Sequence, residues 1–224
     1  MVSVVITAAG SSTRFGENKL LLEIAGKPMI VRTVEQFAKC SKLDEIIVAT
    51  RKQDIPVYQE LFTRYNLSVL VVEGGSERIE SVYKGVQATR GNIILTHDGA
   101  RALTPVWLIE NLIKAVEEYG AAMTAVPPTA TIKYAEDDLI IQRSLARATT
   151  WIAQTPQGFR RDILLSSLES AIHDQYFVAT DDSEIVAMYG HKVKIVVGDF
   201  INMKVTVKSD LVIANELFSQ NLFS

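Results

Sequence analysis

The stretch VSVVITAAGSSTRFGENK, from Val2 to Lys19, decides the fold that the chain is expected to adopt. Its beginning, Val2–Thr7, is mostly apolar, which is typical of a parallel strand covered on both faces. Small residues follow, so the backbone can approach a ligand closely and its consecutive N–H groups can bind an anion. Two cations of the same turn, Arg14 and Lys19, suit a ligand with several negative charges. The stretch therefore predicts a strand that leads into a polyphosphate-binding loop.

Strand-like and helix-like segments alternate through the first half of the chain. Buried strands are expected at Glu45–Thr50, Leu67–Val72 and Asn92–Thr96. Helical spacing of apolar residues predicts helices after Pro28 and at Ile55–Tyr65, Arg78–Thr89 and Pro105–Tyr119. This alternation indicates an α/β fold with a doubly wound, mostly parallel, Rossmann-like sheet. Because ligands of such sheets bind beyond the carboxyl ends of the strands, we expect one site to include Gly10–Lys19, Gly74–Ser76 and Asp98–Arg101.

The alternation is interrupted after the expected strand Ala121–Val126. Pro127-Pro128 ends this strand, and two segments then alternate like a hairpin, Thr129–Ala135 and Leu139–Gln142. The excursion indicates a protruding β-arm at about residues 128–150 that reaches a partner subunit, and a simple surface hairpin is the alternative. The sheet is expected to resume and close with Trp151–Phe159, Arg161–His173, a helix from a Thr180 cap to Met188, Lys192–Val197, Asn202–Val205 and Ser209–Leu217. Residues 1–224 are interpreted as a single domain.

Composition narrows the class of protein. The formal net charge is −3, whereas a nucleic-acid-binding protein is expected to be net basic. No apolar run approaches the roughly 20 residues that a membrane-spanning helix needs. Cys40 is the only cysteine of the sequence, which permits no disulfide within the chain and fits a reducing compartment. We therefore expect a cytoplasmic protein that binds neither nucleic acid nor a membrane.

The first loop lacks two well-known glycine signatures. It has neither the G-x-x-x-x-G-K-[ST] spacing of a P-loop nor G-x-G-x-x-G, which disfavours a P-loop NTPase and a nicotinamide oxidoreductase. Asp98 follows a buried strand, where a carboxylate is unfavourable unless it is paired or binds a metal. It is interpreted as a Mg²⁺ ligand, with a helix cap or a partner for Arg101 as the alternative. His97 is expected to be a neutral core histidine, and Cys40 to pack in the core.

Several motifs carry a resemblance to a known family. AAGSSTRFGENK, from Ala8 to Lys19, resembles the opening of many nucleotidyltransferases. Further along the chain are EGGSERIESV (73–82), HDGAR (97–101), TIK (131–133), QTPQGF (154–159) and NMKVT (202–206). In this order and over almost the full length, the motifs resemble those of the 2-C-methyl-D-erythritol 4-phosphate cytidylyltransferases. A sister family, the ribitol-5-phosphate cytidylyltransferases, shares most of them.

The resemblance implies a cytidylyltransferase that depends on Mg²⁺ or another divalent cation. Such an enzyme joins CTP and 2-C-methyl-D-erythritol 4-phosphate to give 4-diphosphocytidyl-2-C-methyl-D-erythritol and pyrophosphate, in non-mevalonate isoprenoid biosynthesis. The alternative is a ribitol-5-phosphate cytidylyltransferase that makes CDP-ribitol for teichoic acid or related polymers. The resemblance also implies a homodimer in which the arm of one subunit completes the acceptor site of the other.

The same resemblance assigns roles to individual residues. Catalytic roles fall on Arg14, Lys19, Arg147 and Lys204. Nucleotide binding falls on Ala8, Ala9, Gly10, Ser11, Ser12, Gly74, Gly75, Ser81 and Asp98. Acceptor binding falls on Asp98, Arg101, Thr131, Arg147, Thr155 and Lys204. The one metal ligand implied is Asp98.

The chain departs from the family pattern at several positions. Ala130 and Ala146 stand where the family usually has an acidic residue, and Ala102 where it has a proline. The first loop is also shorter than usual before Lys19. All principal cations are present, so activity is expected, and the departures bear on the identity of the polyol-phosphate acceptor. A catalytically silent regulatory subunit, a further alternative, is expected to lack some of these cations or Asp98.

Overall fold

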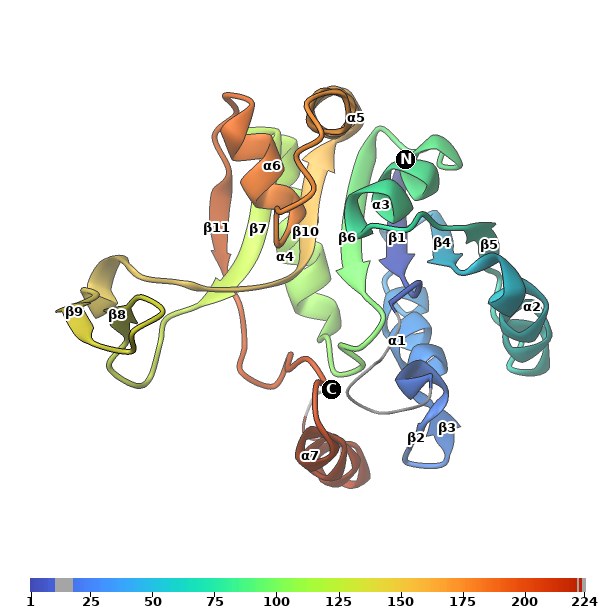
Figure 1. Cartoon of the computed structure of the whole chain (residues 1–224). Coiled ribbons are helices and arrows are strands. Elements are labelled where there is room, and N and C mark those ends of the chain that lie inside the picture. Colours follow the sequence, from blue (N-terminus) through green and yellow to red (C-terminus); the bar gives the residue numbers. More distant parts are fainter. Residues whose placement is uncertain (11–17, 221, 223–224) are drawn as a thin grey trace.

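A seven-stranded sheet in the order β11-β7-β10-β6-β1-β4-β5 forms the centre of the molecule (Figure 1). The structure is a computed structural model and describes residues 1–10, 18–220 and 222. The strands are β1 (Val2–Thr7), β4 (Glu45–Thr50), β5 (Leu70–Glu73), β6 (Ile93–Asp98), β7 (Ala121–Val126), β10 (Ile152–Arg160) and β11 (Lys194–Val197). Only β10 is antiparallel to its neighbours in this sheet, β6 and β7. The predicted mostly parallel α/β sheet is therefore confirmed.

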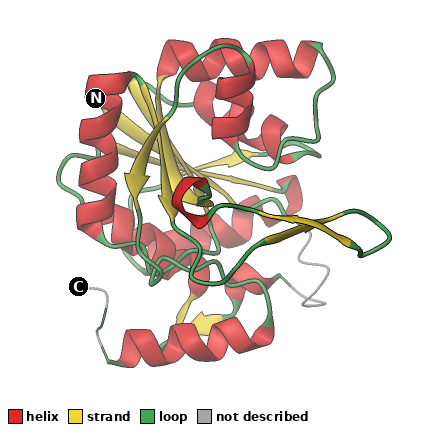
Figure 2. Cartoon of the chain, turned by 90° about the vertical axis from the view of Figure 1, so that its left-hand side faces the viewer, coloured by secondary structure: helices red, strands yellow, loops and turns green. Residues whose placement is uncertain are grey.

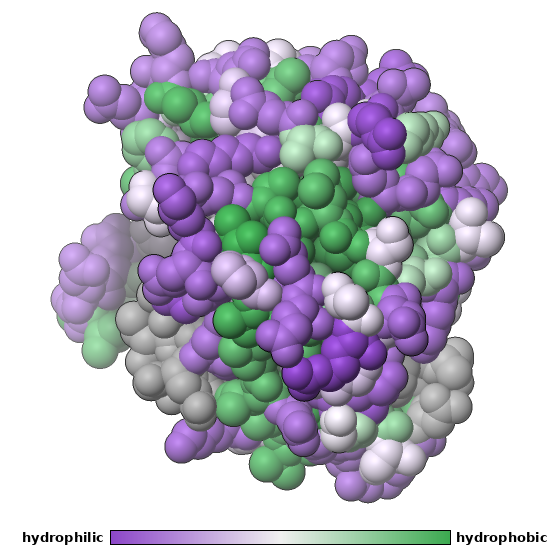
Figure 3. Space-filling view, turned by 90° about the vertical axis from the view of Figure 1, so that its right-hand side faces the viewer, coloured by the Kyte–Doolittle hydropathy of each residue, from purple (hydrophilic) through white to green (hydrophobic). Residues whose placement is uncertain are grey.

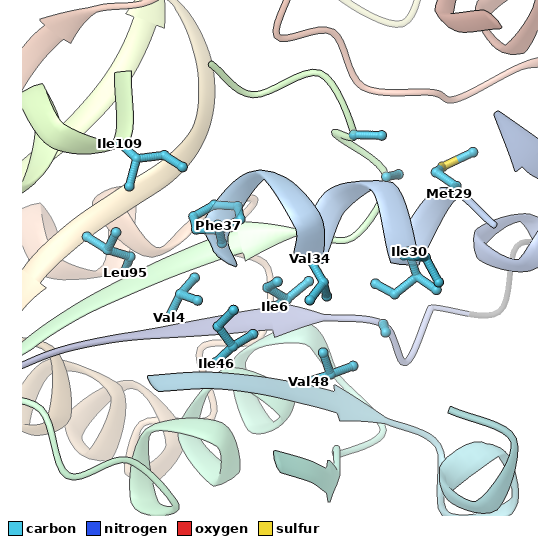
Figure 4. Close-up of a cluster of buried hydrophobic side chains, with 14 of the residues drawn as sticks. Val4, Ile6, Met29, Ile30, Val34, Phe37, Ile46, Val48, Leu95 and Ile109 are labelled. Carbon is cyan, nitrogen blue, oxygen red and sulfur yellow. The ribbon is translucent and has the colours of Figure 1, made fainter. Parts of the chain in front are cut away.

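Helices cover both faces of this sheet. The helices are α1 (Met29–Ala38), α2 (Ile55–Arg64), α3 (Arg78–Gln87), α4 (Val106–Tyr119), α5 (Arg161–His173), α6 (Asp182–Met188) and α7 (Lys208–Ser219). Alternate residues of a strand point to opposite faces, so Val4 and Ile6 of β1 pack with α1, α2 and α4, whereas Val5 packs with α3, α5 and α6. Figure 4 shows the first of these two cores, with Val34 and Phe37 of α1 above β1, β4 and β6.

Four of the differences between predicted and observed elements have a clear physical reason. The third strand begins at Leu70 rather than Leu67, because the chain leaving α2 still turns at Asn66, whose φ is 54°. The fourth strand continues through Asp98, which pairs with Thr7 of β1. Asp181 rather than Thr180 caps α6, since its side chain accepts a hydrogen bond from Glu184 N. No strand forms at residues 202–205, because this segment packs on the loop after β6, where Val205 N donates to Ala100 O over 2.9 Å.

The interruption at Pro127-Pro128 leads into an arm that leaves the sheet. Its hairpin consists of β8 (Lys133–Ala135) and β9 (Ile141–Ser144), and a short 3-10 turn, η3 (Arg147–Thr149), follows. The hairpin extends away from the body of the subunit in both ribbon views (Figures 1 and 2). Its tip is apolar and open to solvent, with 84% of Leu139 exposed and Ile140 beside it also exposed.

The opposite edge of the sheet is formed by β5, beside α2. Figure 3 shows this side of the molecule, where apolar side chains gather amid polar ones. The exposed apolar residues of these two elements include Val57 and Leu70. Within the part of the chain that the structure describes, no helix combines the length and apolar character needed to span a membrane.

Candidate active site

A cavity of about 630 Å³ opens beyond the carboxyl ends of β1, β5 and β6. The segments that line it follow these three strands, together with a loop from late in the chain. Its lining residues include Ala8, Ala9, Gly10, Lys19, Gly75, Ser76, Arg78, Ser81, Asp98 and Lys204. The three polar clusters expected from the sequence are therefore brought together by the topology. The predicted residues Ser11, Ser12 and Arg14 lie outside the described residues.

The glycine-containing loop after β5 is held by two side chains of the first turn of α3. Oε2 of Glu80 accepts hydrogen bonds from Ser76 N, Ser76 Oγ and Glu77 N over 2.8, 2.7 and 3.1 Å. The hydrogen bond from the Ser76 hydroxyl, with those from the backbone, lowers the pKa of Glu80. A Cβ at Gly75 would lie 2.2 Å from Cβ of Glu80, so only glycine fits this close approach.

Ser81, predicted to contact the nucleotide, supports the same loop. Its Oγ accepts a hydrogen bond from Gly75 N over 3.0 Å and donates to Glu77 O over 3.1 Å. Gly74 is fixed by its own backbone, because its N–H donates to Thr50 O and its carbonyl accepts from Lys84 Nζ. Ser81 is nearly fully buried yet lines the cavity, so its hydroxyl both shapes the loop and borders the predicted nucleotide site.

Lys19 enters the cavity from the short 3-10 helix η1 (Lys19–Leu21). The helix is capped by Asn18, whose side chain accepts a hydrogen bond from Leu20 N. Nζ of Lys19 donates to Val205 O over 3.0 Å. The ammonium group is thus placed beside the segment that carries Lys204, and both cations line one cavity.

Asp98 lies at the centre of a cluster of cations. Its Oδ2 lies 2.9 Å from Lys204 Nζ and 3.6 Å from Arg101 Nε, and its Oδ1 lies 4.0 Å from Arg78 Nε. Burial by itself raises the pKa of this carboxyl, but the charges of Lys204, Arg78 and Arg101 outweigh burial and hold it well below its usual range. The group is therefore an ionised carboxylate, and the ion pair with Arg101 that was the alternative to a metal ligand is present.

His97 has the neutral, buried environment expected for a core histidine. Nε2–H donates to Arg101 O over 3.2 Å, so the other nitrogen, Nδ1, accepts from Thr155 Oγ1 over 3.1 Å. Burial lowers the pKa of His97 to about 3. The same Thr155 hydroxyl accepts a hydrogen bond from Asp98 N over 3.1 Å. Thr155, predicted to bind the acceptor, therefore ties β10 to the end of β6.

A second cavity, of about 210 Å³, adjoins the first. Arg78, Asp98 and Lys204 line both cavities and form the wall that they share. The other residues of the second cavity are Arg101, Ala153, Gln154, Thr155, Gln157, Thr180 and Asp181. Four of the predicted acceptor residues, Asp98, Arg101, Thr155 and Lys204, are thus brought together here.

The two predicted acceptor residues of the arm lie elsewhere. Thr131 and Arg147 are exposed, and neither lines the two cavities of its own chain. Among the described residues, the Arg147 side chain makes one long hydrogen bond, from Nη1 to Thr129 O within the arm over 3.4 Å. In a single chain these residues are therefore separated from the predicted site residues that line the two cavities.

Sequence reasoning missed Arg78, the first residue of α3. Its Nη1 and Nη2 donate to Oδ1 and Oδ2 of Asp182 over 2.7 and 2.9 Å. Burial by itself lowers the pKa of Arg78, but the charge and hydrogen bonds of Asp182 outweigh it and raise that pKa above its usual value. The position of Arg78 after the Gly74-Gly75 loop was the available signal. Its partner on α6 is too distant in sequence for any spacing rule to find.

The doubly wound sheet, with its glycine-containing loop and a basic site beyond the strand ends, defines an α/β nucleotide-binding protein. The family of 2-C-methyl-D-erythritol 4-phosphate cytidylyltransferases matches residues 2–220. Enzymes of that name from Caldanaerobacter subterraneus and Bacillus mycoides are 40% and 38% identical to this chain, over 97% and 96% of it and 98% and 96% of their own lengths. The chain therefore belongs to the 2-C-methyl-D-erythritol 4-phosphate cytidylyltransferase family.

Solved structures agree with this assignment. The 4-diphosphocytidyl-2C-methyl-D-erythritol synthase of Anaerococcus prevotii superposes with a TM-score of 0.87 at 29% identity, covering 97% of this chain and 98% of its own. The 2-C-methyl-D-erythritol 4-phosphate cytidylyltransferase of Thermus thermophilus gives a TM-score of 0.81 at 29% identity, with 96% and 97% covered. The predicted family resemblance is confirmed, and the nicotinamide oxidoreductase alternative is excluded.

Proposed function

We propose that the protein transfers the cytidylyl group of CTP to 2-C-methyl-D-erythritol 4-phosphate, giving 4-diphosphocytidyl-2-C-methyl-D-erythritol and pyrophosphate in non-mevalonate isoprenoid biosynthesis. The observation that carries the proposal is the wall of Arg78, Asp98 and Lys204 between two adjoining cavities, in a chain of this family. The larger cavity suits a nucleoside triphosphate, and the smaller one suits a polyol phosphate. The relatives named above are all methylerythritol phosphate enzymes, so they lend no support to the ribitol-5-phosphate alternative.

The reaction needs cations more than it needs a base. A phosphate oxygen of the acceptor attacks the α-phosphorus of CTP in line, and the bond from that phosphorus to the pyrophosphate oxygen breaks. The nucleophile is already anionic, so the main obstacle is repulsion between two phosphate groups. Lys204 lines both cavities and Lys19 lines the larger one, so their charges offset this repulsion and that of the transition state.

Selection of cytosine is assigned to the loop after β5. Backbone groups around Gly74 and Gly75 are fixed by Ser81 and Glu80, so the loop presents its donors and acceptors in a set arrangement. The exocyclic amine of cytosine requires an acceptor. Uracil has a carbonyl at that position, so two acceptors would face each other without a proton between them. We therefore propose that CTP is preferred to UTP.

Mg²⁺ is part of the proposal, with Asp98 as its protein ligand. Among the described residues Oδ1 of Asp98 makes no hydrogen bond, and its ion pair with Arg78 Nε is 4.0 Å long, so one oxygen is available. No group of three or more His, Cys, Asp or Glu side chains in the described part of the chain is arranged to hold a metal. A single carboxylate fits Mg²⁺, which binds through few carboxylates together with substrate phosphates and water. When bound, the ion would neutralise triphosphate charge.

The quaternary structure belongs to the same proposal. The arm carries Thr131 and Arg147 away from the cavities of its own chain, and its apolar tip at Leu139 and Ile140 is exposed. A homodimer in which each arm reaches the other subunit would place a guanidinium beside the partner's smaller cavity. A cytoplasmic location is proposed on the single cysteine, Cys40, which is buried and unpaired. Cell fractionation tests this location.

Pyrophosphate release from CTP tests the proposed function. The purified protein is assayed with Mg²⁺ and either 2-C-methyl-D-erythritol 4-phosphate, ribitol 5-phosphate or erythritol 4-phosphate, and each acceptor is repeated with UTP. We expect turnover with CTP and the methylerythritol phosphate, at least tenfold above every other combination. Preferred use of ribitol 5-phosphate would reject the proposed acceptor, and no release with any acceptor would favour a silent regulatory subunit.

A further inference from the structure

Arg78 occupies the junction of the two cavities and is held there from outside both of them. Its partner Asp182, at the start of α6, lines neither cavity. The side chain of Asp182 is 0% exposed, whereas 27% of the Arg78 side chain is exposed. A carboxylate without contact to water needs a cation close by, so Arg78 is the group that makes the burial of Asp182 tolerable.

The pair has the forked geometry that fixes a guanidinium in one orientation. Nη1 and Nη2 each donate to a different oxygen of Asp182, over 2.7 and 2.9 Å. Such bidentate pairs add directional specificity to the attraction between charges. A guanidinium has five N–H donors, and this fork uses two of them. The remaining donors, among them Nε–H on the side of Asp98, are left at the junction of the cavities.

The same fork determines how Asp98 is paired. Because Asp182 takes the two terminal nitrogens of Arg78, only Nε approaches Asp98, at 4.0 Å from Oδ1. The closer partners of Asp98, Lys204 and Arg101, both lie against Oδ2. A released Arg78 would be free to form its own fork with Asp98, and both oxygens of that carboxylate would then be occupied.

We propose that Asp182 is a positioning residue: it orients Arg78 as a phosphate-facing cation at the junction of the two cavities and keeps Arg78 from closing on Asp98. This inference rests on the proposed function. The competing explanation is structural, because an acidic residue in the first turn of α6 is favourable to the helix on its own. In that case the effect of Asp182 on catalysis would not depend on Arg78.

A double-mutant cycle separates the two explanations. Asp182→Asn keeps the size of the side chain but turns one acceptor into a donor that faces Arg78. We expect this variant to lower kcat/KM for the acceptor at least tenfold, with a less than threefold change in the Kd of CTP measured by calorimetry. In an Arg78→Gln background the same change is expected to have an effect of less than twofold. An equal loss in both backgrounds, or no loss in the first, would overturn the proposal.

Asp162→Asn provides the matched control, because it makes the same acid-to-amide change in the first turn of another helix, α5. Asp162 is exposed and lines neither cavity, so activity is expected to stay within twofold of the wild-type value. If Asp182→Asn does not fold, as judged by circular dichroism, the cycle is run with Asp182→Glu. That variant keeps the charge but displaces the fork, and the same dependence on Arg78 is expected.

The orientation of Arg78 is also measured without turnover, by the ¹H–¹⁵N signals of the two groups that form the fork, Nη1 and Nη2. Wild-type protein and Asp162→Asn are expected to give separate, slowly exchanging Nη signals, which are lost or shifted in Asp182→Asn. Unchanged Nη signals in Asp182→Asn would show that Asp182 does not hold Arg78. Absence of wild-type turnover would reject the proposed function, whereas the Nη signals would still decide whether Asp182 positions Arg78.

Discussion

Nζ of Lys204 lies 2.9 Å from Oδ2 of Asp98, so a loop near the end of the chain is joined to the carboxyl end of β6. This contact brings the acid predicted to bind metal together with the cation predicted to face the reacting phosphates. It also lies in the wall between the two cavities. The contact therefore joins Asp98, whose ion pairs are expected to stabilise the fold, to Lys204, which is expected to act in the reaction. The effects on stability and on catalysis are tested separately.

Replacement of Asp98 tests how much its ion pairs contribute to the stability of the fold. The pKa of the carboxyl is lowered in the folded protein, so its ionised form stabilises the fold at pH values above its ordinary value of 3.8, and this contribution is lost as pH falls below that value. Asp98→Asn is expected to lower the free energy of unfolding at pH 7 by about 1–3 kcal/mol, because the buried Arg101 and the partly buried Arg78 lose a charged partner. Urea denaturation measures this difference, with the exposed Asp137→Asn as control. Equal stability of wild type and Asp98→Asn at pH 7 would contradict the ion-pair account.

Replacement of Lys19 tests how much a cation of the larger cavity contributes to catalysis. Lys19→Ala removes a positive charge from the wall of the larger cavity and is expected to lower kcat by about 10²-fold or more, by analogy with single donors to a developing anion. Initial rates of pyrophosphate release measure the effect, and circular dichroism checks the fold. The exposed Lys52→Ala serves as control and is expected to keep wild-type activity. Full activity in Lys19→Ala would remove this residue from the phosphate site.

The buried His97 predicts how stability depends on pH. Its pKa of about 3 in the folded protein is below the ordinary value of 6.5, so below pH 6.5 the unfolded chain binds a proton that the folded chain does not. As the pH is lowered from 6.5 to 4.5, the free energy of unfolding is therefore expected to decrease by about 1.4 kcal/mol per pH unit. His97→Gln is expected to flatten the slope, whereas the exposed His173→Gln is not. An unchanged slope in His97→Gln would mean that other groups cause it.

Mixing of inactive subunits tests the role of the arm. An Arg147→Ala chain and a Lys19→Ala chain, each inactive alone, are combined under conditions of subunit exchange. If the arm serves the partner, a heterodimer has one site with both defects and one with neither, so it regains up to half the activity of a wild-type dimer. Native mass spectrometry verifies exchange. Verified heterodimers without activity would place Arg147 in the site of its own chain or in none.

Parts of the fold were predictable because local pattern and tertiary position agree. The bounds of β1 and β4 were predicted without error, since a continuous apolar run bounded by polar residues shows where a buried strand begins and ends. The start of β5 was misplaced because Leu67 and Val69 are as apolar as the strand itself. The strand predicted at residues 202–205 does not form. The alternation of apolar and polar residues there reflects packing on the loop after β6, which is not a strand and does not pair with it as one.

The site was predictable to the extent that its residues follow strands. Asp98 and Gly75 could be located in this way, because parallel strands bring their carboxyl ends to one edge of the sheet. The link between Arg78 and Asp182 could not, because helices on separate crossovers are brought together only by the packed fold. The location of Thr131 and Arg147 relative to a catalytic centre likewise depends on a second subunit, which no pattern within one chain defines.

The fate of the acceptor's phosphate oxygens tests the proposed transfer most directly. The acceptor, 2-C-methyl-D-erythritol 4-phosphate, is prepared with ¹⁸O in its non-bridging phosphate oxygens and incubated with CTP, Mg²⁺ and the protein. ³¹P NMR and mass spectrometry of the products then locate the label. The account predicts unlabelled pyrophosphate and a diphosphate product with ¹⁸O in the oxygen that bridges its two phosphorus atoms. Label in pyrophosphate, or a product whose ¹⁸O is confined to a terminal monophosphate, would contradict attack by the acceptor phosphate on the α-phosphorus.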